Sequence, residues 1–134
     1  MLLIRNIAAT SFTADAAQIP FDTTVLSTND NLVLKDNSVN ALSAGVYDTV
    51  CQVEVTNTSS SAAATVTLSA YADGKAIPGA VTSATIGASG QAALVLPWAT
   101  KVVDAASGTA KLSWYLSGGA VSMTGAIARI QKVI

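Results

Sequence analysis

Few residues in this chain have side chains suited to catalysis. The 134-residue sequence contains no histidine and one cysteine, Cys51, together with eight acidic and seven basic residues. Without histidine, a Ser-His-Asp or Cys-His nucleophile and a histidine-based metal site are excluded. Cys51 has no second cysteine with which to form a disulfide or a metal site, so we expect it to be a small buried apolar residue. The sequence therefore predicts a protein that is not an enzyme and has no cofactor and no metal.

The carboxylates are scattered along the chain, mostly in segments with turn-forming composition, where they form Asx turns or keep the surface soluble. They are Asp15, Asp22, Asp30, Asp36, Asp48, Glu54, Asp73 and Asp104. Only Glu54 is flanked by apolar residues, and its phase places it on a polar face, which does not favour a glycosidase-type acid. The oxygen-rich segments 28–31 and 36–37 could supply calcium ligands, but their spacing matches no calcium loop.

The balance of charged and apolar residues narrows the classes of partner. Hydrophobic residues make up 51% of the chain and charged residues 11%, with a formal net charge of -1 and no run of Lys or Arg. We therefore expect no binding to nucleic acid. The apolar start, Met1 to Ile4, ends at Arg5 and is too short for a signal-peptide core or a membrane span, so we expect synthesis in a cytoplasm without a signal peptide and no membrane partner.

Two neighbouring segments show strict alternation of apolar and polar residues. In the segment 46–57, Tyr47 and Cys51 share one face, while Gln52 and Glu54 share the other. The segment 65–73 alternates in the same way and ends at Asp73-Gly74, a pair typical of a two-residue hairpin turn because both positions need positive φ. Each run predicts a strand with one face in the core and the other in water or in an interface.

Other runs predict further short strands separated by turns. They cover residues 2–8, 25–27, 32–35, 38–42, 92–98, 111–117 and 121–134. The connection 10–22 is expected to be irregular, with Ile19 and Phe21 as core anchors beside Pro20. Glycine pairs mark reversals at 87–90 and 118–119. About eight to ten short strands and no helical period predict an all-β fold, a single-domain antiparallel β-sandwich of jelly-roll type over residues 1–134, with 1–18 as an N-terminal strand or arm.

The final run is apolar on both faces of the expected strand. Ile127 and Val133 fall on one side, and Ile130 and Ile134 on the other. This pattern predicts a strand that is buried on both faces, either in the middle of a sheet or inside an assembly.

Four segments, in this order, resemble the trimeric jelly roll of the C1q and tumour necrosis factor superfamily. They are Ile19-Pro-Phe-Asp-Thr-Thr-Val-Leu26, Ala44-Gly-Val-Tyr-Asp48, Ala70-Tyr-Ala-Asp-Gly-Lys-Ala-Ile-Pro-Gly79, and the closing strand Val121 to Val133. The chain differs from that superfamily in having no collagen-like Gly-X-Y stalk and few aromatic residues. It is most similar to the short form found in bacteriophage virion proteins.

The resemblance implies a homotrimer whose role is structural, as a capsid decoration protein that binds the major capsid protein lattice and stabilises the exterior of a phage particle. Small neutral residues on both faces of the strands are consistent with surface hidden between copies. Tyr71, Tyr115, Ile130 and Ile134 are the candidate trimer-interface residues. The apolar start of the chain, Leu2, Leu3 and Ile4, supplies the candidate capsid contacts.

A second hypothesis is a receptor-binding or glycan-binding tip on a head or tail fibre. It requires an exposed aromatic and polar cluster. Trp98 and Trp114 share the phase of core leucines, which favours core packing, whereas Tyr71 and Tyr115 lie out of phase and are the better candidates for an exposed surface. Burial of both tryptophans would count against this hypothesis.

Overall fold

A computed structural model shows an all-β chain, and it describes residues 1–28, 32–41, 43–102 and 110–133. The strands are β1 (Leu2–Asn6), β2 (Thr10–Phe12), β3 (Ala17–Gln18), β4 (Thr23–Ser27), β5 (Leu32–Lys35), β6 (Ser38–Ala41), β7 (Gly45–Asn57), β8 (Ala64–Ala72), β9 (Lys75–Ile86), β10 (Gln91–Val102), β11 (Ala110–Ser117) and β12 (Val121–Lys132). Within the described residues no helix is long and apolar enough to cross a membrane.

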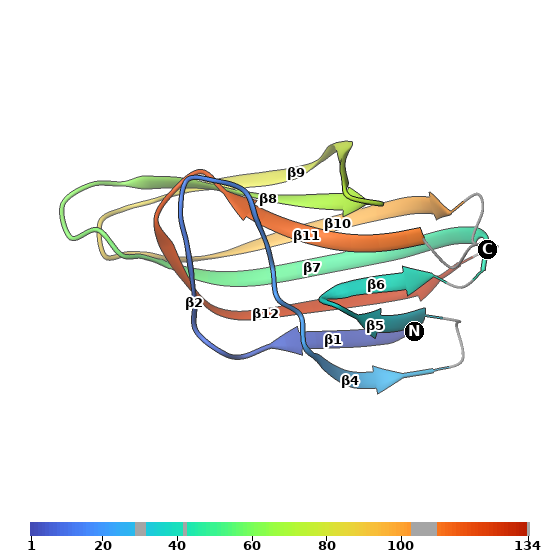
Figure 1. The fold of residues 1–134 in the computed structure, drawn as a ribbon. Coiled ribbons are helices and arrows are strands. Elements are labelled where there is room, and N and C mark those ends of the chain that lie inside the picture. The colour runs from blue at the N-terminus through green and yellow to red at the C-terminus, as the bar shows by residue number, and fades with distance from the viewer. Residues whose placement is uncertain (29–31, 42, 103–109, 134) are drawn as a thin grey trace.

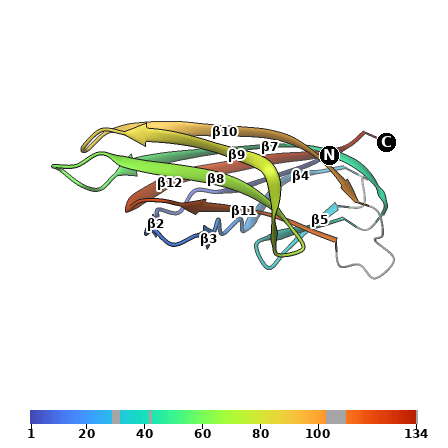
Figure 2. The same cartoon turned by 90° about the horizontal axis from the view of Figure 1, so that it is seen from above.

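The strands form two antiparallel sheets packed face to face (Figures 1 and 2). Sheet A has the order β10-β7-β12-β1-β4, with β2 paired to β12. Sheet B has the order β5-β6-β11-β8-β9, with β3 paired to β11. Seen from above, β10, β7 and β12 lie in one layer and β11, β3 and β5 in the other (Figure 2). The predicted fold class, an antiparallel β-sandwich, is confirmed.

The turns follow from residues that tolerate positive φ. Asp73 and Gly74 adopt φ values of 52° and 79°, and the hairpin between β8 and β9 closes as the sequence predicts. Asp36 and Asn37 adopt 52° and 63° between β5 and β6, a second turn of the same kind. At Gly118, where φ is 104°, an added Cβ would lie 2.5 Å from the Thr65 carbonyl oxygen, so this turn needs glycine.

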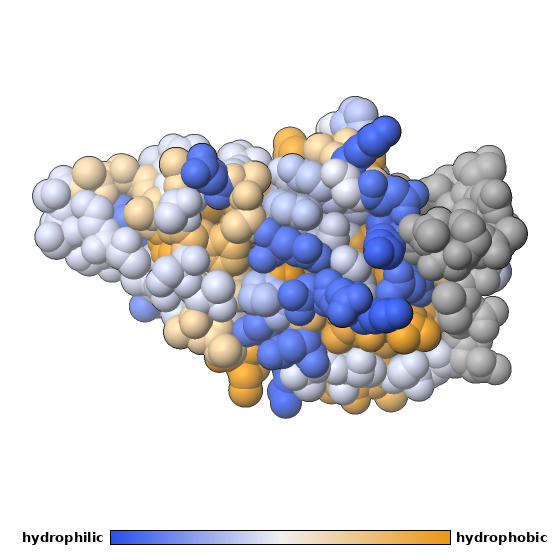
Figure 3. All heavy atoms as spheres, in the orientation of Figure 1, coloured by the Kyte–Doolittle hydropathy of each residue, from blue (hydrophilic) through white to orange (hydrophobic). Residues whose placement is uncertain are grey.

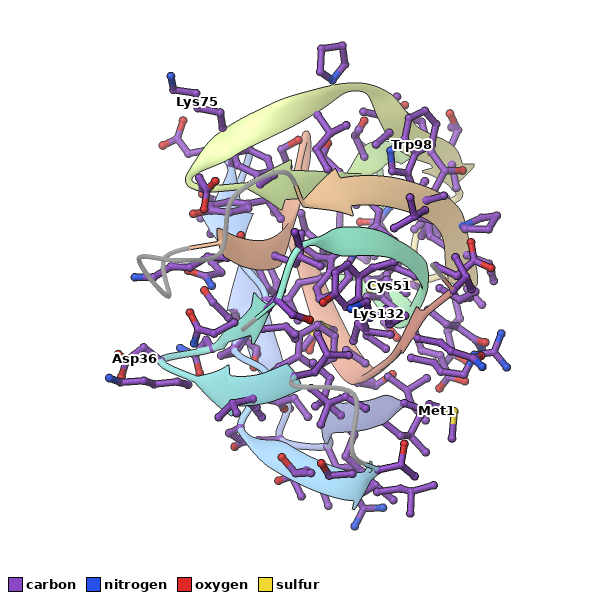
Figure 4. All side chains as sticks on the ribbon, turned by 90° about the vertical axis from the view of Figure 1, so that its right-hand side faces the viewer. Met1, Asp36, Cys51, Lys75, Trp98 and Lys132 are labelled. Carbon is purple, nitrogen blue, oxygen red and sulfur yellow. The ribbon has the colours of Figure 1, made fainter. Side chains whose placement is uncertain are left out.

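The alternation predicted for the long strands places their apolar side chains between the sheets. Tyr47 and Cys51 on β7 and Leu68 on β8 are fully buried. Figure 4 views the sandwich from one end and shows Cys51 in its interior. Trp114 lies in the same core and packs edge-on against Phe21 at a ring-centroid distance of 5.6 Å.

Strand number is the first point at which the prediction was wrong. The connection 10–22 was expected to be irregular, but β2 and β3 form within it, so the described residues contain more strands than the eight to ten predicted. Both strands are very short, and the same segment contains Asp15 and Pro20, which are typical of loops, so its composition does not predict a strand. The predicted core anchors in this segment are confirmed, because Ile19 and Phe21 are fully buried.

The second correction concerns the burial of the last strand. β12 lies between β7 and β1, so its central place in a sheet is confirmed. It is not buried on both faces, because the register with β7 shifts between Met123 and Gly125. This bulge moves Ile130 to the core side and turns Ile127 outward, where it is 41% exposed.

Candidate functional surface

The side chains that could take part in catalysis or bind a metal are dispersed over the described part of the structure or buried. No group of three or more acidic, cysteine or histidine side chains converges in the part of the chain that the structure describes. The Cys51 thiol is fully buried, and loss of solvation raises its pKa far above the usual value. Of the oxygen-rich segments considered for calcium, residues 29–31 lie outside the described residues.

A lysine–serine contact occurs where β7 begins and β12 ends. Lys132 Nζ donates a hydrogen bond to Ser43 Oγ at 3.1 Å, and the Tyr47 hydroxyl donates to the Ser43 carbonyl oxygen at 2.7 Å. A lysine that donates to the serine hydroxyl does not take its proton, so this geometry does not activate a nucleophile. The cluster instead fixes the backbone that leads into β7.

Two adjacent rows of residues on the outer face of sheet A are mostly apolar. Pairing in register sets Val95, Gln52, Ile127 and Arg5 in one row across β10, β7, β12 and β1. The next row contains Pro97, Val50, Arg129, Leu3 and Leu26. Val95 is 47% exposed and Leu26 is 45% exposed. We call these two rows the apolar face.

A hollow of about 200 Å³ lies on this side of sheet A beside the bulge in β12. Its walls include Arg5, Ile7, Glu54 and Ile127. Gly125 forms part of the floor, and a Cβ added there would meet nothing within 4 Å. A second hollow, of about 270 Å³, adjoins Glu54 on the side of β10. The bulge in β12 therefore lies beside a recess in the outer face of sheet A.

The outer face of sheet B is different in chemistry. Cross-strand pairs join Thr65 to Thr85 at 3.0 Å and Thr67 to Ser83 at 2.8 Å between their hydroxyl oxygens. Figure 3 looks onto the side of the molecule that carries β11, β6 and β5, and its middle is mostly neutral or hydrophilic. The outer face of sheet B therefore carries hydroxyl pairs over β8 and β9, together with the exposed Val81 on β9 and Val33 on β5.

Tyr71 and Tyr115 lie together on the outer face of sheet B. Their rings stack with centroids 3.9 Å apart and an interplanar angle of 28°, and both side chains are half-buried. The tryptophans lie elsewhere, as their phase predicts: Trp114 is 1% exposed, and Trp98 is half-buried against the core. The glycan-binding surface therefore loses both tryptophans and retains only the tyrosines.

Several candidate contact residues are not on the surface. Leu2 and Ile4 face the core of the protomer and are 1% and 0% exposed, so they are not available to a capsid. Leu3 faces outward on β1 and is half-buried. Ile130 is fully buried within the protomer, which corrects its assignment to a trimer interface. Ile134 lies outside the described residues.

The apolar face was missed because a bulge reverses the phase of β12. Alternation counted from Met123 places Ile127 on the core side, and the extra residue places it outside. The one signal in the sequence is Gly125, since an isolated glycine in a strand often marks a bulge. Leu26 and Val95 lay in predicted strands, but their exposure depends on which strands form the edges of sheet A.

Comparison with known proteins finds similarity in fold to solved structures, but no similar sequence. No family model matches the chain, and no curated protein sequence matches it. The solved structure of murine APRIL at pH 5.0 is similar with a TM-score of 0.68 and 11% identity over 98% of both chains. The structure of Eiger TNF from S. frugiperda is similar with a TM-score of 0.65 and 9% identity, over 99% of this chain and 92% of that one. The chain therefore has the jelly-roll fold seen in these TNF-type structures.

Proposed function

We propose that the protein is a structural module that associates with copies of itself through the apolar face of sheet A. The observation that carries this proposal is the set of exposed apolar side chains on that face, together with the recess beside Gly125. Contiguous apolar surface on one side of a sheet is typical of protein–protein contacts. Its burial between copies removes that surface from water.

Charge supports a second copy as the partner. The outer face of sheet A carries Arg5 and Arg129 together with Asp48 and Glu54, so positive and negative side chains are balanced on it. A surface of mixed sign can meet another copy of itself without net repulsion. A nucleic acid or a strongly acidic partner would instead require an excess of positive charge.

The proposal has two further parts, namely that the assembly is a homotrimer and that it binds the exterior of a phage capsid. Their support is the order of sequence segments that resemble phage virion jelly rolls, together with the TNF-type fold. In a trimer, three weak contacts to a capsid lattice act together, so binding is avid although each contact is small. Electron microscopy of particles that carry the protein tests this part. Knobs on the capsid facets would support decoration, and density at the tail alone would contradict it.

Self-association is tested by light scattering of purified protein, in which one chain has a mass of 13.5 kDa. Ile127→Asp places a carboxylate in the apolar face, and its desolvation at a contact costs several kcal/mol. We expect this variant to be monomeric at concentrations where the parent is not. Val81→Asp is the matched control, because Val81 on β9 of sheet B is 51% exposed and lies outside the contact.

Gly125→Leu tests the recess itself. Nothing lies within 4 Å of a Cβ at this position, so the longer side chain fills the hollow with little cost to the protomer. We expect unchanged thermal stability of the monomer and weaker association. Unchanged association of both Gly125→Leu and Ile127→Asp would contradict the assignment of the interface to sheet A.

A further inference from the structure

We propose that the outer face of sheet B binds neutral carbohydrate around the Tyr71–Tyr115 pair. The site lies on the opposite side of the sandwich from the apolar face, so self-association through sheet A leaves it open. The statement that the site stays open in the assembly rests on the proposed function. The affinity of a single chain for sugar does not depend on it.

The tyrosine rings are fixed before any ligand arrives. Tyr71 on β8 pairs in register with Ser113, and Tyr115 on β11 pairs with Ser69, so the two rings occupy diagonal positions on one face. Their stacking at 3.9 Å restricts the rotation of both rings. Little side-chain entropy is therefore lost on binding. The electron-rich faces of aromatic rings attract the weakly positive C–H groups of a pyranose ring.

The immediate neighbours of the rings on β9 are apolar, because Ala76 pairs with Tyr71 and Val81 with Ser69, and polar groups lie further along the same face. Toward β9 the hydroxyl pairs Thr67–Ser83 and Thr65–Thr85 continue the outer face away from the tyrosines. Toward β3, Gln18 pairs in register with Tyr115, and its amide nitrogen donates to Ser38 Oγ at 3.0 Å. Hydroxyl and amide groups both donate and accept hydrogen bonds, as sugar hydroxyls do.

The charge around the rings favours a neutral sugar over an acidic one. The residues that pair across the tyrosines, Ser69 and Ser113, carry no charge. Among the charged residues, Lys111 lies further along β11, and Lys75 pairs with Ala72, the residue after Tyr71. Asp73 lies in the adjacent turn, where its Oδ1 accepts a hydrogen bond from the Lys111 backbone N–H at 2.8 Å. No charged residue pairs directly with either tyrosine, so no cation is positioned against the rings to hold an anionic glycan.

The affinity expected for one site is low. Two rings and a few exchanged hydrogen bonds correspond to a Kd on the order of 1 mM, or about -4 kcal/mol. Several copies in one assembly would raise the apparent affinity for a polymer that spans more than one site.

Nuclear magnetic resonance titration of the full-length chain tests the site, with cellopentaose, maltopentaose and chitopentaose as probes at up to about 10 mM. We expect at least one probe to shift the ring resonances of Tyr71 and Tyr115. Tyr71→Ala and Tyr115→Ala should each weaken binding by about tenfold or more, while the Phe variants, which keep the rings, should bind within a few-fold of the parent. A backbone spectrum of each variant confirms that it is folded.

Three results would overturn the proposal. They are the absence of ring shifts with all three probes, shifts that map to another face, and undiminished binding by folded Ala variants. Ile127→Asp separates this inference from the proposed function. It should abolish self-association and leave the affinity per chain for the pentasaccharide unchanged, whereas the tyrosine variants should do the reverse.

Discussion

Asn57 ties together the loops at one end of the sandwich, and its removal should be costly. The side chain is 2% exposed. Its Nδ2 lies 2.8 Å from the Ala62 carbonyl oxygen, 3.1 Å from that of Ile86 and 3.2 Å from that of Gly87. Its Oδ1 accepts a hydrogen bond from the Ser59 backbone N–H at 3.0 Å. Asn57→Ala removes all of these contacts and leaves buried carbonyl groups without this partner.

The expected loss of stability in Asn57→Ala follows from the number of hydrogen-bond donors and acceptors that the substitution removes. The amide has two protons, shared among three carbonyls, and one accepting oxygen, so about three hydrogen bonds at roughly 1 kcal/mol each give about 3 kcal/mol. For a domain of this length, that lowers the melting temperature by about 12 °C. Thr58→Ala is the control, since it removes one exposed hydrogen bond, to the Ala120 carbonyl oxygen at 3.1 Å, and should cost less than about 1 kcal/mol.

Asn57→Asp gives the same test a dependence on pH. A carboxylate facing three carbonyl oxygens is repelled, so the pKa of the introduced Asp rises in the folded state. The part of the destabilisation that comes from this repulsion should then be absent below the unfolded-state pKa of about 4 and grow as the pH rises above it, whereas the cost of the lost amide proton is present at every pH. Thermal melts followed by circular dichroism at acidic and neutral pH measure this. A melting temperature for Asn57→Ala close to that of the parent, or equal cost of Asn57→Asp at both pH values, would refute the reasoning.

The other predictions concern the core thiol and a turn. Cys51 should not react with a thiol reagent at pH 8 until the protein is unfolded, because its burial raises its pKa; labelling of the folded chain at the rate of a free thiol would contradict this. Asp73→Val puts a β-branched residue at a φ of 52° and removes the acceptor of the Lys111 N–H, so we expect a loss of about 2–3 kcal/mol in chemical denaturation. Asp73→Asn keeps an oxygen acceptor and a residue that tolerates positive φ. It should therefore cost less than about 1 kcal/mol, as most surface substitutions do.

The parts of the fold that the sequence predicted depend on local chemistry. The alternation around Cys51 and the hairpin at Asp73-Gly74 follow from side-chain period and backbone preference, which act over a few residues. The two short strands β2 and β3 depend on distant partners, since β2 pairs with β12 and β3 pairs with β11. No local pattern specifies such pairing, and the segment that contains them resembles a loop in composition.

The candidate contact surfaces were harder to predict than the fold. The phase argument correctly placed Tyr71 and Tyr115 outside the core, although it did not show that their rings stack. It failed for Ile127 and Ile130, because a single extra residue at the bulge exchanges the two faces of β12. Leu2 and Ile4 resembled a free apolar start, but β1 lies between β12 and β4 and these side chains fill the core. Exposure depends on strand order, which the residues of one strand do not reveal.

The most direct test of self-association through sheet A is the mass of the parent protein and of Ile127→Asp at the same concentration, measured by sedimentation or light scattering. One chain has a mass of 13.5 kDa. We predict that the parent has three times this mass, that Ile127→Asp has the mass of one chain, and that Val81→Asp behaves as the parent does. A parent protein that is monomeric at micromolar concentration, or an Ile127→Asp variant that keeps the mass of the parent, would contradict the account.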